Sequence, residues 1–277
     1  MVDKLETVFK RKYPRYAGRI LAIWEIYTGT KPLWTSLSMN NLNKFREGLL
    51  AEVSINSAVT YGKMFKAVLS SCSDEVHIPN AYNRILAFKK EATLSTWLTE
   101  EEIDVLLHAA THNELERLVL TQFLLGCLTG ARHSDFINFT EDNIRDDKLV
   151  YVSQKSKIKS EIPLAPAVVR LIATRDGVGE VVESTFNRVI RRICEREGIT
   201  QNTQVYRGGR YQHGPKYLFV SSHTARRSFA TNLYLRCRDL YLVSTYMGHS
   251  RVDQTTKYIM SMGDAPVDVQ AFFDRFK

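Results

Sequence analysis

The sequence predicts a mainly α protein with a small antiparallel β-sheet (α+β), in two domains that cover residues 1–95 and 96–277. Four observations lead to this prediction. Apolar residues recur at helical spacing through most of the chain. The segment Thr99–Glu102 is a capping box, which marks the start of a new helix and of a new domain. Residues 149–164 change to the pattern of two short strands, and 277 residues are enough for two separate cores.

The composition is that of an ordinary globular protein with an excess of positive charge. Hydrophobic residues make up 44% of the chain and charged residues 25%, and the formal net charge is +8. This charge favours a polyanionic partner. No apolar run approaches the roughly 18 residues that a membrane helix needs. Residues 1–13 are charged where a signal peptide is apolar, so we expect a cytoplasmic protein without membrane contact.

The sequence predicts neither a metal site nor a nucleotide site. The four cysteines are scattered without a CxxC or Cys/His ligand spacing, and we interpret them as reduced and mostly buried: Cys72, Cys127, Cys194 and Cys237. The chain has no GxxxxGK[ST] loop for a nucleotide phosphate and no cluster of carboxylates for Mg²⁺. We therefore expect a protein that works without a cofactor or a metal.

The first domain is predicted as helices joined by short loops. One helix ends at Gly29, a second begins at a cap on Ser36 or Ser38, and a third covers residues 55–71. Residues 1–95 hold 14 Lys and Arg against 8 Asp and Glu, while the rest of the chain holds 24 against 22. The positive excess of this domain is either a solvated helical surface or a module that contacts DNA phosphates.

The second domain begins with the capping box and continues into a helix over residues 114–128, which a nearly continuous apolar run over residues 118–125 predicts to be buried. This helix ends at Gly130, and Arg132 follows directly. We expect an arginine just after a buried helix to be held rigidly, with Asp135 as its orienting carboxylate. The alternative for an isolated Arg/Asp pair is a structural salt bridge.

Residues 149–152 and 161–164 are short β-like runs on either side of a lysine-rich segment. We expect a hairpin or small sheet with these lysines near its tip: Lys155, Lys157 and Lys159. The lysines either protect an edge strand from aggregation or bring an ammonium group into an anionic site.

Two helices and a loop lead to the last part of the domain. The helices cover residues 166–173 and a stretch from a cap on Ser184 to Glu197, and residues 198–215 are predicted as a surface loop or a distorted hairpin. The tail, residues 266–276, is amphipathic and is predicted to pack on its own domain or on a neighbouring molecule.

A helix over residues 224–235, with Ser222 as its N-cap, is predicted to place His223 and Arg226 at a helix N-terminus. Free N–H groups and the positive end of the helix dipole favour an anion there. Asp239 is predicted to cap the helix that follows.

Gly248-His249 and Tyr258 complete this C-terminal group of side chains. Ser250, with Asp253 three residues later, is predicted to cap a short helix that leads to Tyr258. Two imidazoles, a guanidinium and a phenol are groups that can bind a phosphodiester and attack it through an aromatic hydroxyl. Taken singly, each has an ordinary alternative: a chance HxxR triplet, a structural histidine or a tyrosine of the core.

The ordered set of these residues resembles the tyrosine recombinase (phage integrase) family. The set is Arg132, Lys155, His223-x-x-Arg226, Gly248-His249 and Tyr258. The resemblance covers residues 99–259 as the catalytic domain and, more loosely, residues 1–95 as the helical, SAM-like core-binding domain. The segment HTARRSFATN looks most like integrases of Bacteroidetes mobile elements. No long segment precedes residues 1–95 to serve as an arm-binding domain, so we expect the compact two-domain form.

The resemblance implies a role for each residue of the set. Arg132 and Arg226 would hold the non-bridging oxygens of the scissile phosphate, and His249 would add a further donor. His223 would take the proton of Tyr258, which would attack the phosphorus and form a 3′-phosphotyrosine link. A phenol with a pKa near about 10 needs such a base and fixed positive charge before it is a good nucleophile.

The resemblance implies Lys155 as the acid for the leaving 5′ oxygen, because this lysine directly follows the first strand as in the family. Lys157 and Lys159 compete for this role. Asp135 stands where the family often has glutamate, and we expect its shorter side chain still to orient Arg132.

The function implied by the resemblance is site-specific DNA recombination or integration by a homotetramer on double-stranded DNA. The reaction would pass through a Holliday junction and would need neither metal nor ATP. Accessory DNA-bending proteins are candidate partners, and we expect the protein to associate with the nucleoid when it is bound to DNA. The alternatives are strand relaxation of the type IB topoisomerase kind and an architectural DNA-binding protein whose site has decayed.

Overall fold

The structure is a computed structural model of the whole chain, and it describes residues 4–91, 93–174, 176–249 and 251–256, together with Ile259, Asp274 and Arg275. Three of the predictions concern residues outside this description. They are the cap at Ser250, the nucleophile Tyr258 and the amphipathic tail 266–276 apart from Asp274 and Arg275. The chain divides into two compact units. Unit 1 comprises Met1–Thr93 and Tyr206–Arg210, and unit 2 comprises Leu94–Val205 and Tyr211–Lys277.

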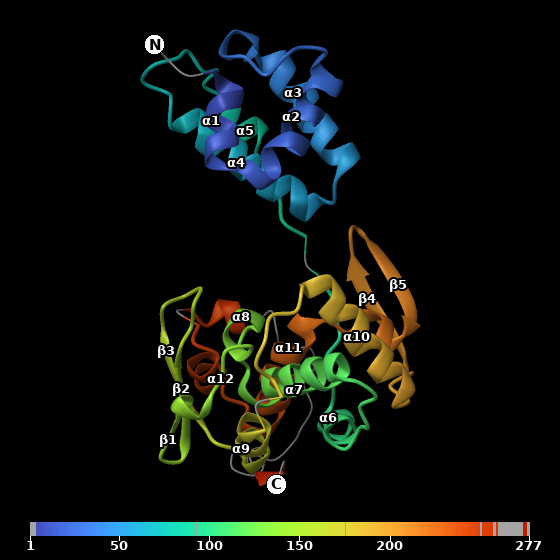
Figure 1. Cartoon of the computed structure of the whole chain (residues 1–277). Helices are drawn as coiled ribbons and strands as arrows, with labels where there is room; N and C mark the ends of the chain where they lie inside the picture. Colours follow the sequence, from blue (N-terminus) through green and yellow to red (C-terminus); the bar gives the residue numbers. More distant parts are fainter. Residues whose placement is uncertain are drawn as a thin grey trace. The chain divides into compact units, whose positions relative to one another are not determined.

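Unit 1 is helical around an aromatic core (Figure 1). Its elements are α1 (Leu5–Lys12), α2 (Pro14–Thr28), η1 (Trp34–Ser36), α3 (Met39–Glu52), α4 (Ile55–Ser70) and α5 (Tyr82–Ile85). Trp24 stacks on Phe65 with ring centres 5.5 Å apart, and Phe45 lies 4.7 Å from Phe65. Burial of such aromatic pairs is a large stabilising contribution. Gly29, in the left-handed conformation, ends α2, and Ser38 caps α3, as predicted.

Unit 2 combines helices with two small antiparallel sheets, which confirms the predicted fold class. Its first half contains α6 (Glu100–Leu107), α7 (Glu114–Thr129), α8 (His133–Phe136), η2 (Glu141–Asn143), β1 (Ile144–Arg145), β2 (Lys148–Val152), β3 (Lys159–Pro163) and α9 (Pro166–Ala173). Its second half contains α10 (Glu183–Arg196), β4 (Asn202–Arg207), β5 (Arg210–Pro215), η3 (Lys216–Phe219), α11 (Ser222–Cys237), α12 (Leu240–Tyr246) and α13 (Asp253–Thr256). The end of β4 and the start of β5, within Tyr206–Arg210, are assigned to unit 1.

The three-stranded sheet has the order β1-β2-β3 and is antiparallel throughout. Leu149 of β2 faces Ile162 of β3, and both side chains are fully buried. The sequence predicted β2 and β3 within two residues of their observed ends but missed the very short β1. Residues 198–215, predicted as a loop or a distorted hairpin, form the hairpin β4–β5.

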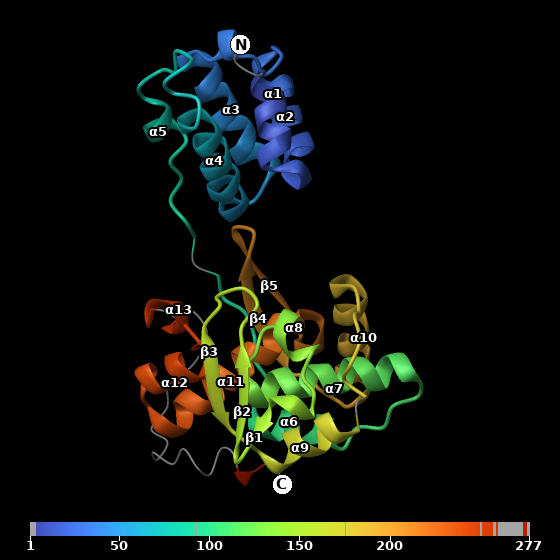
Figure 2. The ribbon, with the colours of Figure 1, turned by 60° about the vertical axis from the view of Figure 1, so that its left-hand side comes forward.

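The helices α7 and α11 lie in the middle of unit 2, with the three-stranded sheet towards one side and α10 towards the other (Figures 1 and 2). They pack closely because α7 carries Gly126 at the contact. A Cβ atom on Gly126 would lie 2.9 Å from the Cβ of Ala225 in α11 and 2.7 Å from the ring of Phe136. Close packing leaves no room for that atom. The contact therefore fixes α11 against the end of α7.

Two predicted helix starts are wrong. The helix α10 begins at Glu183 rather than after a cap on Ser184, because an acidic residue in the first turn is favoured by the helix dipole. The helix α11 begins at Ser222, the residue predicted as its cap, two residues before the predicted start at residue 224. Ser221 takes the cap position, and its backbone N–H donates to Thr224 Oγ1 at 2.9 Å. Ser222 is unavailable as a cap because its N–H and hydroxyl both bond to α10.

Replacing Gly130 by alanine is expected to lower the free energy of unfolding by about 2 to 4 kcal/mol. Gly130 ends α7 with φ +66°, and an added Cβ would collide with the ring of Phe229. Gly198 is the matched control because it has φ +77° but no atom within 4 Å of the added Cβ. Gly198→Ala should therefore cost only the backbone term, about 1 to 2 kcal/mol. Urea denaturation followed by circular dichroism measures both, and equal losses would contradict the packing argument.

Candidate active site

Arg226 is the centre of the group of polar side chains predicted from the sequence. Its guanidinium is only 1% exposed, although it lies in the second turn of α11. It donates to the carbonyl oxygen of Gly130 at the end of α7, and to that of Met247 after α12 at 2.7 Å. Burying an arginine is costly unless its N–H groups are bonded. These bonds therefore join three helix ends around one positive charge.

His249 binds Arg226 directly. Nη2 of Arg226 lies 2.8 Å from Nε2 of His249, and Nδ1 of His249 lies 2.9 Å from Oγ1 of Thr255. A guanidinium can only donate, so Nε2 accepts and the ring carries its proton on Nδ1, which donates to Thr255. In this arrangement His249 orients Arg226 instead of presenting a donor of its own at Nε2. A donor role towards a phosphate requires that Arg226 release this nitrogen.

The backbone conformation and the close packing at position 248 explain why a glycine precedes this histidine. Its φ is +58°, and a Cβ atom there would lie 2.6 Å from Oγ of Ser160 in β3. Only glycine combines this backbone conformation with such a close approach. The segment that carries His249 is thereby held against the edge of the sheet.

Arg132 reaches the same region from the other side of Gly130. Its Nη1 donates to Oγ of Ser153 at 3.0 Å, and Ser153 Oγ donates to Oδ2 of Asp135 at 2.9 Å. Oδ1 of Asp135 accepts from the backbone N–H of Gln154 at 2.8 Å. Among the described residues no direct ion pair joins Arg132 to Asp135. Asp135, the predicted orienting carboxylate, contacts Arg132 through Ser153 and at the same time holds the start of the β2–β3 turn.

The charges of the two arginines converge on Tyr151 of β2. Burial raises the pKa of its phenol, while the guanidiniums of Arg226 and Arg132 act to lower it. Tyr151 faces Ser160 of β3 across the sheet. Both arginines therefore lie beside the same strand.

His223 lies in the first turn of α11 with its side chain exposed to solvent. The surrounding chain still removes enough water to lower the pKa of its imidazole, and the charges of Arg227, Arg226 and Lys155 lower it further. Glu183 acts in the opposite direction. A lowered pKa keeps the imidazole neutral near pH 7, which is the form that accepts a proton.

The three lysines of the β2–β3 segment differ in their surroundings. Lys155 is exposed in the turn, and its charge is among those that act on His223. Lys157 has the left-handed φ of +58°. Lys159 is engaged at 2.6 Å by Glu161 on its own strand. The surroundings thus distinguish Lys155 from its two neighbours.

Tyr258 and Lys257 lie outside the described residues. The helix α13 ends at Thr256, and Ile259 packs against the hydrophobic core of unit 2. The structure thus brings together Arg132, His223, Arg226 and His249 with Lys155 nearby, and it describes the chain on both sides of the candidate nucleophile.

Sequence reasoning missed three residues that support the site: Ser153, Glu183 and Thr255. The alternation of buried side chains along β2 was a usable signal for Ser153, because it falls on the same face as Leu149 and Tyr151 and is 1% exposed. Glu183 and Thr255 had no comparable signal, since both act through contacts with distant or irregular segments.

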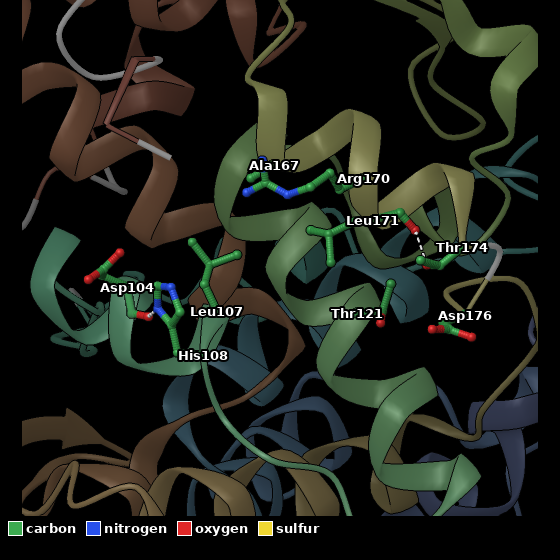
Figure 3. A pocket seen from close by; sticks show the side chains of 9 residues that line it. All are labelled: Asp104, Leu107, His108, Thr121, Ala167, Arg170, Leu171, Thr174 and Asp176. Atoms are coloured by element: carbon green, nitrogen blue, oxygen red, sulfur yellow. Dashed lines mark hydrogen bonds between the residues drawn. The ribbon is translucent and has the colours of Figure 1, made fainter. Parts of the chain in front are cut away.

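A separate hollow of about 200 Å³ lies between α6, α7 and α9 (Figure 3). Asp104, His108, Thr121, Arg170 and Asp176 are among its lining residues, and none of the predicted site residues is. His108 Nδ1 is bonded to the backbone oxygen of Asp104 at 2.8 Å, and Asp176 pairs with Arg117 at 3.1 Å. Because the hollow contains none of the predicted site residues, it is a feature of the surface apart from the candidate site.

The cysteines are free, and three of them are buried. Burial raises the pKa of Cys194 to about 12. In the described part of the chain no three His, Cys, Asp or Glu side chains are grouped as metal ligands. None of the described helices has both the length and the apolar character that a membrane crossing requires.

Comparison with known proteins identifies the family of this chain. Residues 96–263 match the family model described as the phage integrase family. The integrase of Escherichia phage P2 is 25% identical over 174 residues, which are 61% of this chain and 44% of that protein. The integrase of Haemophilus phage HP1 is 23% identical over 182 residues, which are 65% of this chain and 48% of that protein. The chain thus spans about half the length of the phage integrases that it matches.

Solved structures share the fold. A crystal structure of a lambda integrase dimer bound to a COC′ core site has a TM-score of 0.64 at 16% identity, with 95% of both chains covered. A lambda integrase tetramer bound to a Holliday junction has a TM-score of 0.62 at 16% identity and covers 90% of this chain and 78% of that one. At this identity the likeness extends to the fold.

Proposed function

Because this chain belongs to the phage integrase family, we propose that it is a tyrosine site-specific recombinase that cleaves and rejoins DNA strands. The observation that carries the proposal is the convergence of Arg226, Arg132 and His249 around the end of α7, next to His223. Two guanidiniums beside a neutral imidazole suit a phosphodiester, because they offer charged donors to its oxygens and a base to its attacker.

The two arginines would bind the non-bridging oxygens of the scissile phosphate. Arg226 is already fixed by backbone carbonyls on two helices, and Arg132 is fixed through Ser153. Donors that are held in place before the reaction stabilise the charge of the pentavalent phosphorane without reorganisation. His249 would serve by keeping Arg226 in place.

In the cleavage step the hydroxyl oxygen of Tyr258 would attack the phosphorus while its proton passes to His223. The bond from phosphorus to the 5′ oxygen would break, and that oxygen would take a proton from Lys155. The product would be a 3′-phosphotyrosine and a free 5′ hydroxyl. Because a phosphodiester replaces a phosphodiester, the reverse attack by a 5′ hydroxyl needs no ATP. The positive charges that stabilise the phosphorane come from side chains.

Double-stranded DNA is the proposed substrate. Residues 201–216, which contain the β4–β5 hairpin, have no acidic side chain, and residues 1–95 carry 14 basic against 8 acidic residues. Such charge favours phosphates. We propose that unit 1 is the core-binding domain, that the active form is a tetramer acting through a Holliday junction, and that accessory DNA-bending proteins assist. The reaction would take place in the cytoplasm, with the protein bound to the nucleoid.

Trapping covalent protein–DNA adducts on the DNA that flanks the gene tests this proposal. Denaturation during the reaction should leave the protein on the 3′ phosphate at one defined position, and mapping of that position identifies the target site. The absence of adducts under all salt conditions that permit binding would contradict the proposal. Relaxation of any supercoiled plasmid regardless of sequence would instead support an activity of the type IB topoisomerase kind.

Replacing Lys155 by alanine is expected to slow strand cleavage by about 10²-fold or more, because general acid catalysis contributes about 10² to 10⁴. Lys157→Ala and Lys159→Ala are the matched controls and should cleave at nearly the normal rate. A substrate with sulfur in place of the leaving 5′ oxygen should restore cleavage by the Lys155 variant, because a thiolate leaves without a proton. If the sulfur substrate rescues Lys157→Ala or Lys159→Ala instead, the acid is one of those lysines.

A further inference from the structure

Three polar residues of α10 form a stripe along one face of the helix. Glu183, Asn187 and Arg191 are spaced four residues apart, so their side chains project from successive turns on the same side. They contact a short segment of the chain, residues 220–222, that leads directly into α11.

Each residue of this stripe bonds to a different atom of the segment. Glu183 Oε1 accepts from the hydroxyl of Ser222 at 2.9 Å, and Asn187 Oδ1 accepts from the backbone N–H of Ser222 at 2.8 Å. Arg191 Nε donates to the carbonyl oxygen of Val220 at 2.8 Å. Ser222 is 2% exposed and Val220 is fully buried. The segment is thus held at three atoms, and its polar groups inside the protein are satisfied by α10.

The segment that α10 holds ends immediately before His223. The N–H of Ser222 is one of the donors that a helix leaves without an internal partner in its first turn, so Asn187 acts as an external cap. Arg226, one turn later, is fixed independently by Gly130 and Met247. The position of His223 relative to Arg226 therefore depends on α10 at one end and on α7 and α12 at the other.

Charge adds a second influence on His223. The charged and titratable groups that act on it come from α10, α11, the β2–β3 turn and α8: Glu183, Arg226, Arg227, Lys155 and His133. The carboxylate of Glu183 opposes the positive charges by raising the pKa of His223, after burial has lowered it. Glu183 acts in the same direction on His133, whose ring lies edge-on to Phe136 and Phe186. Glu183 is solvent-exposed, so salt weakens this effect.

We propose that Glu183, Asn187 and Arg191 form a clamp that positions His223 for the proton transfer from Tyr258. They are positioning residues, because they reach the reaction only through Ser222 and His223. Glu183 additionally favours the protonated imidazole, so it shifts the acidic limit of cleavage to higher pH. The inference rests on the proposed function and assigns α10 a task that none of the predicted site residues performs.

The charge part of the clamp is tested by Glu183→Gln, whose amide oxygen still accepts from Ser222 but carries no charge. The measurement is single-turnover cleavage of a nicked substrate as a function of pH. Without the carboxylate the imidazole loses its proton more easily, so the acidic limb of the profile is expected to move to lower pH. Glu180→Gln is the control, since it removes the same charge from an exposed residue three positions earlier. That control should leave the profile unchanged.

The positioning part is tested at Asn187. Asn187→Leu removes the acceptor for Ser222 and is expected to slow cleavage by about tenfold or more, with DNA affinity unchanged, because the buried N–H of Ser222 is left without its partner and His223 next to it is held less well. Asn187→Asp keeps an acceptor oxygen and adds a negative charge near His223. It should restore the rate and move the acidic limb to higher pH, opposite to Glu183→Gln. A purely structural contact would not produce opposite shifts.

The outcomes separate the two proposals. If the wild-type protein forms no covalent adduct, the proposed function fails. If the wild-type protein forms adducts but the variants at Glu183 and Asn187 retain its rate and pH profile, the clamp is wrong. Thermal unfolding identifies a variant that fails to fold, and Asn187→Asp keeps the test decisive in that case because its bond to Ser222 is preserved.

Discussion

Replacing Tyr258 by phenylalanine is expected to abolish covalent protein–DNA adducts on a nicked suicide substrate, in which the released strand fragment diffuses away and traps the adduct. The substitution removes only the hydroxyl oxygen that would bond to phosphorus, and no other group of the site can take its place. DNA affinity should stay the same, because the aromatic ring is retained. Gel electrophoresis of the denatured reaction measures adducts, and a mobility shift measures binding.

Tyr241→Phe is the matched control for this experiment. Tyr241 lies on α12 in the same unit and is 74% exposed, so loss of its hydroxyl should change neither cleavage nor binding. Adducts of undiminished yield in Tyr258→Phe would remove the basis for the assigned nucleophile and for the tyrosine chemistry as a whole.

Replacing Arg226 by lysine is expected to reduce cleavage by about 10² to 10³-fold or more, the usual cost of removing one fixed donor to a developing oxyanion. An ammonium cannot reproduce the planar fork of a guanidinium. It cannot serve Gly130, Met247 and His249 together, so buried acceptors lose their donors. We expect a loss of about 2 to 4 kcal/mol in the free energy of unfolding, because each unsatisfied buried group costs about 1 to 3 kcal/mol.

The two effects of this substitution are separable. Cleavage is measured at a temperature at which circular dichroism shows the variant to be folded. Arg192→Lys, on the exposed face of α10, makes the same chemical change without these contacts and should alter neither quantity. Arg132 is half-buried and donates to a side chain, that of Ser153. Arg132→Lys should therefore slow cleavage with a smaller loss in the free energy of unfolding than Arg226→Lys. Normal cleavage by a folded Arg226→Lys protein would contradict the proposed phosphate grip.

Features that depend on neighbouring residues could be predicted from the sequence. The capping box of Thr99 and Glu102, the cap of Asp239 and the end of α2 at Gly29 all form as predicted. A cap needs only a side-chain acceptor within three residues of an N–H group. The strands β2 and β3 were also predictable, because the period of their apolar residues differs from that of a helix.

Features that depend on distant segments could not be predicted in this way. Ser222 resembles a cap in the sequence, but α10 engages both its N–H and its hydroxyl, and the cap moves to Ser221. Asp135 resembles a direct partner of Arg132, but Ser153, which comes from the end of β2, lies between them. In both cases a residue far away in the chain competes successfully for the same polar group.

The sequence by itself determined the fold class and the chemical identity of the proposed site, because both follow from which side chains are present and in what order. It did not determine how those side chains are held. Arg226 is buried among carbonyls from α7 and α12, His249 accepts from it, and α10 holds the chain before His223. Tertiary structure alone decided these contacts, because hydrogen bonds form between atoms that the fold brings within about 3 Å, however far apart they are in the chain.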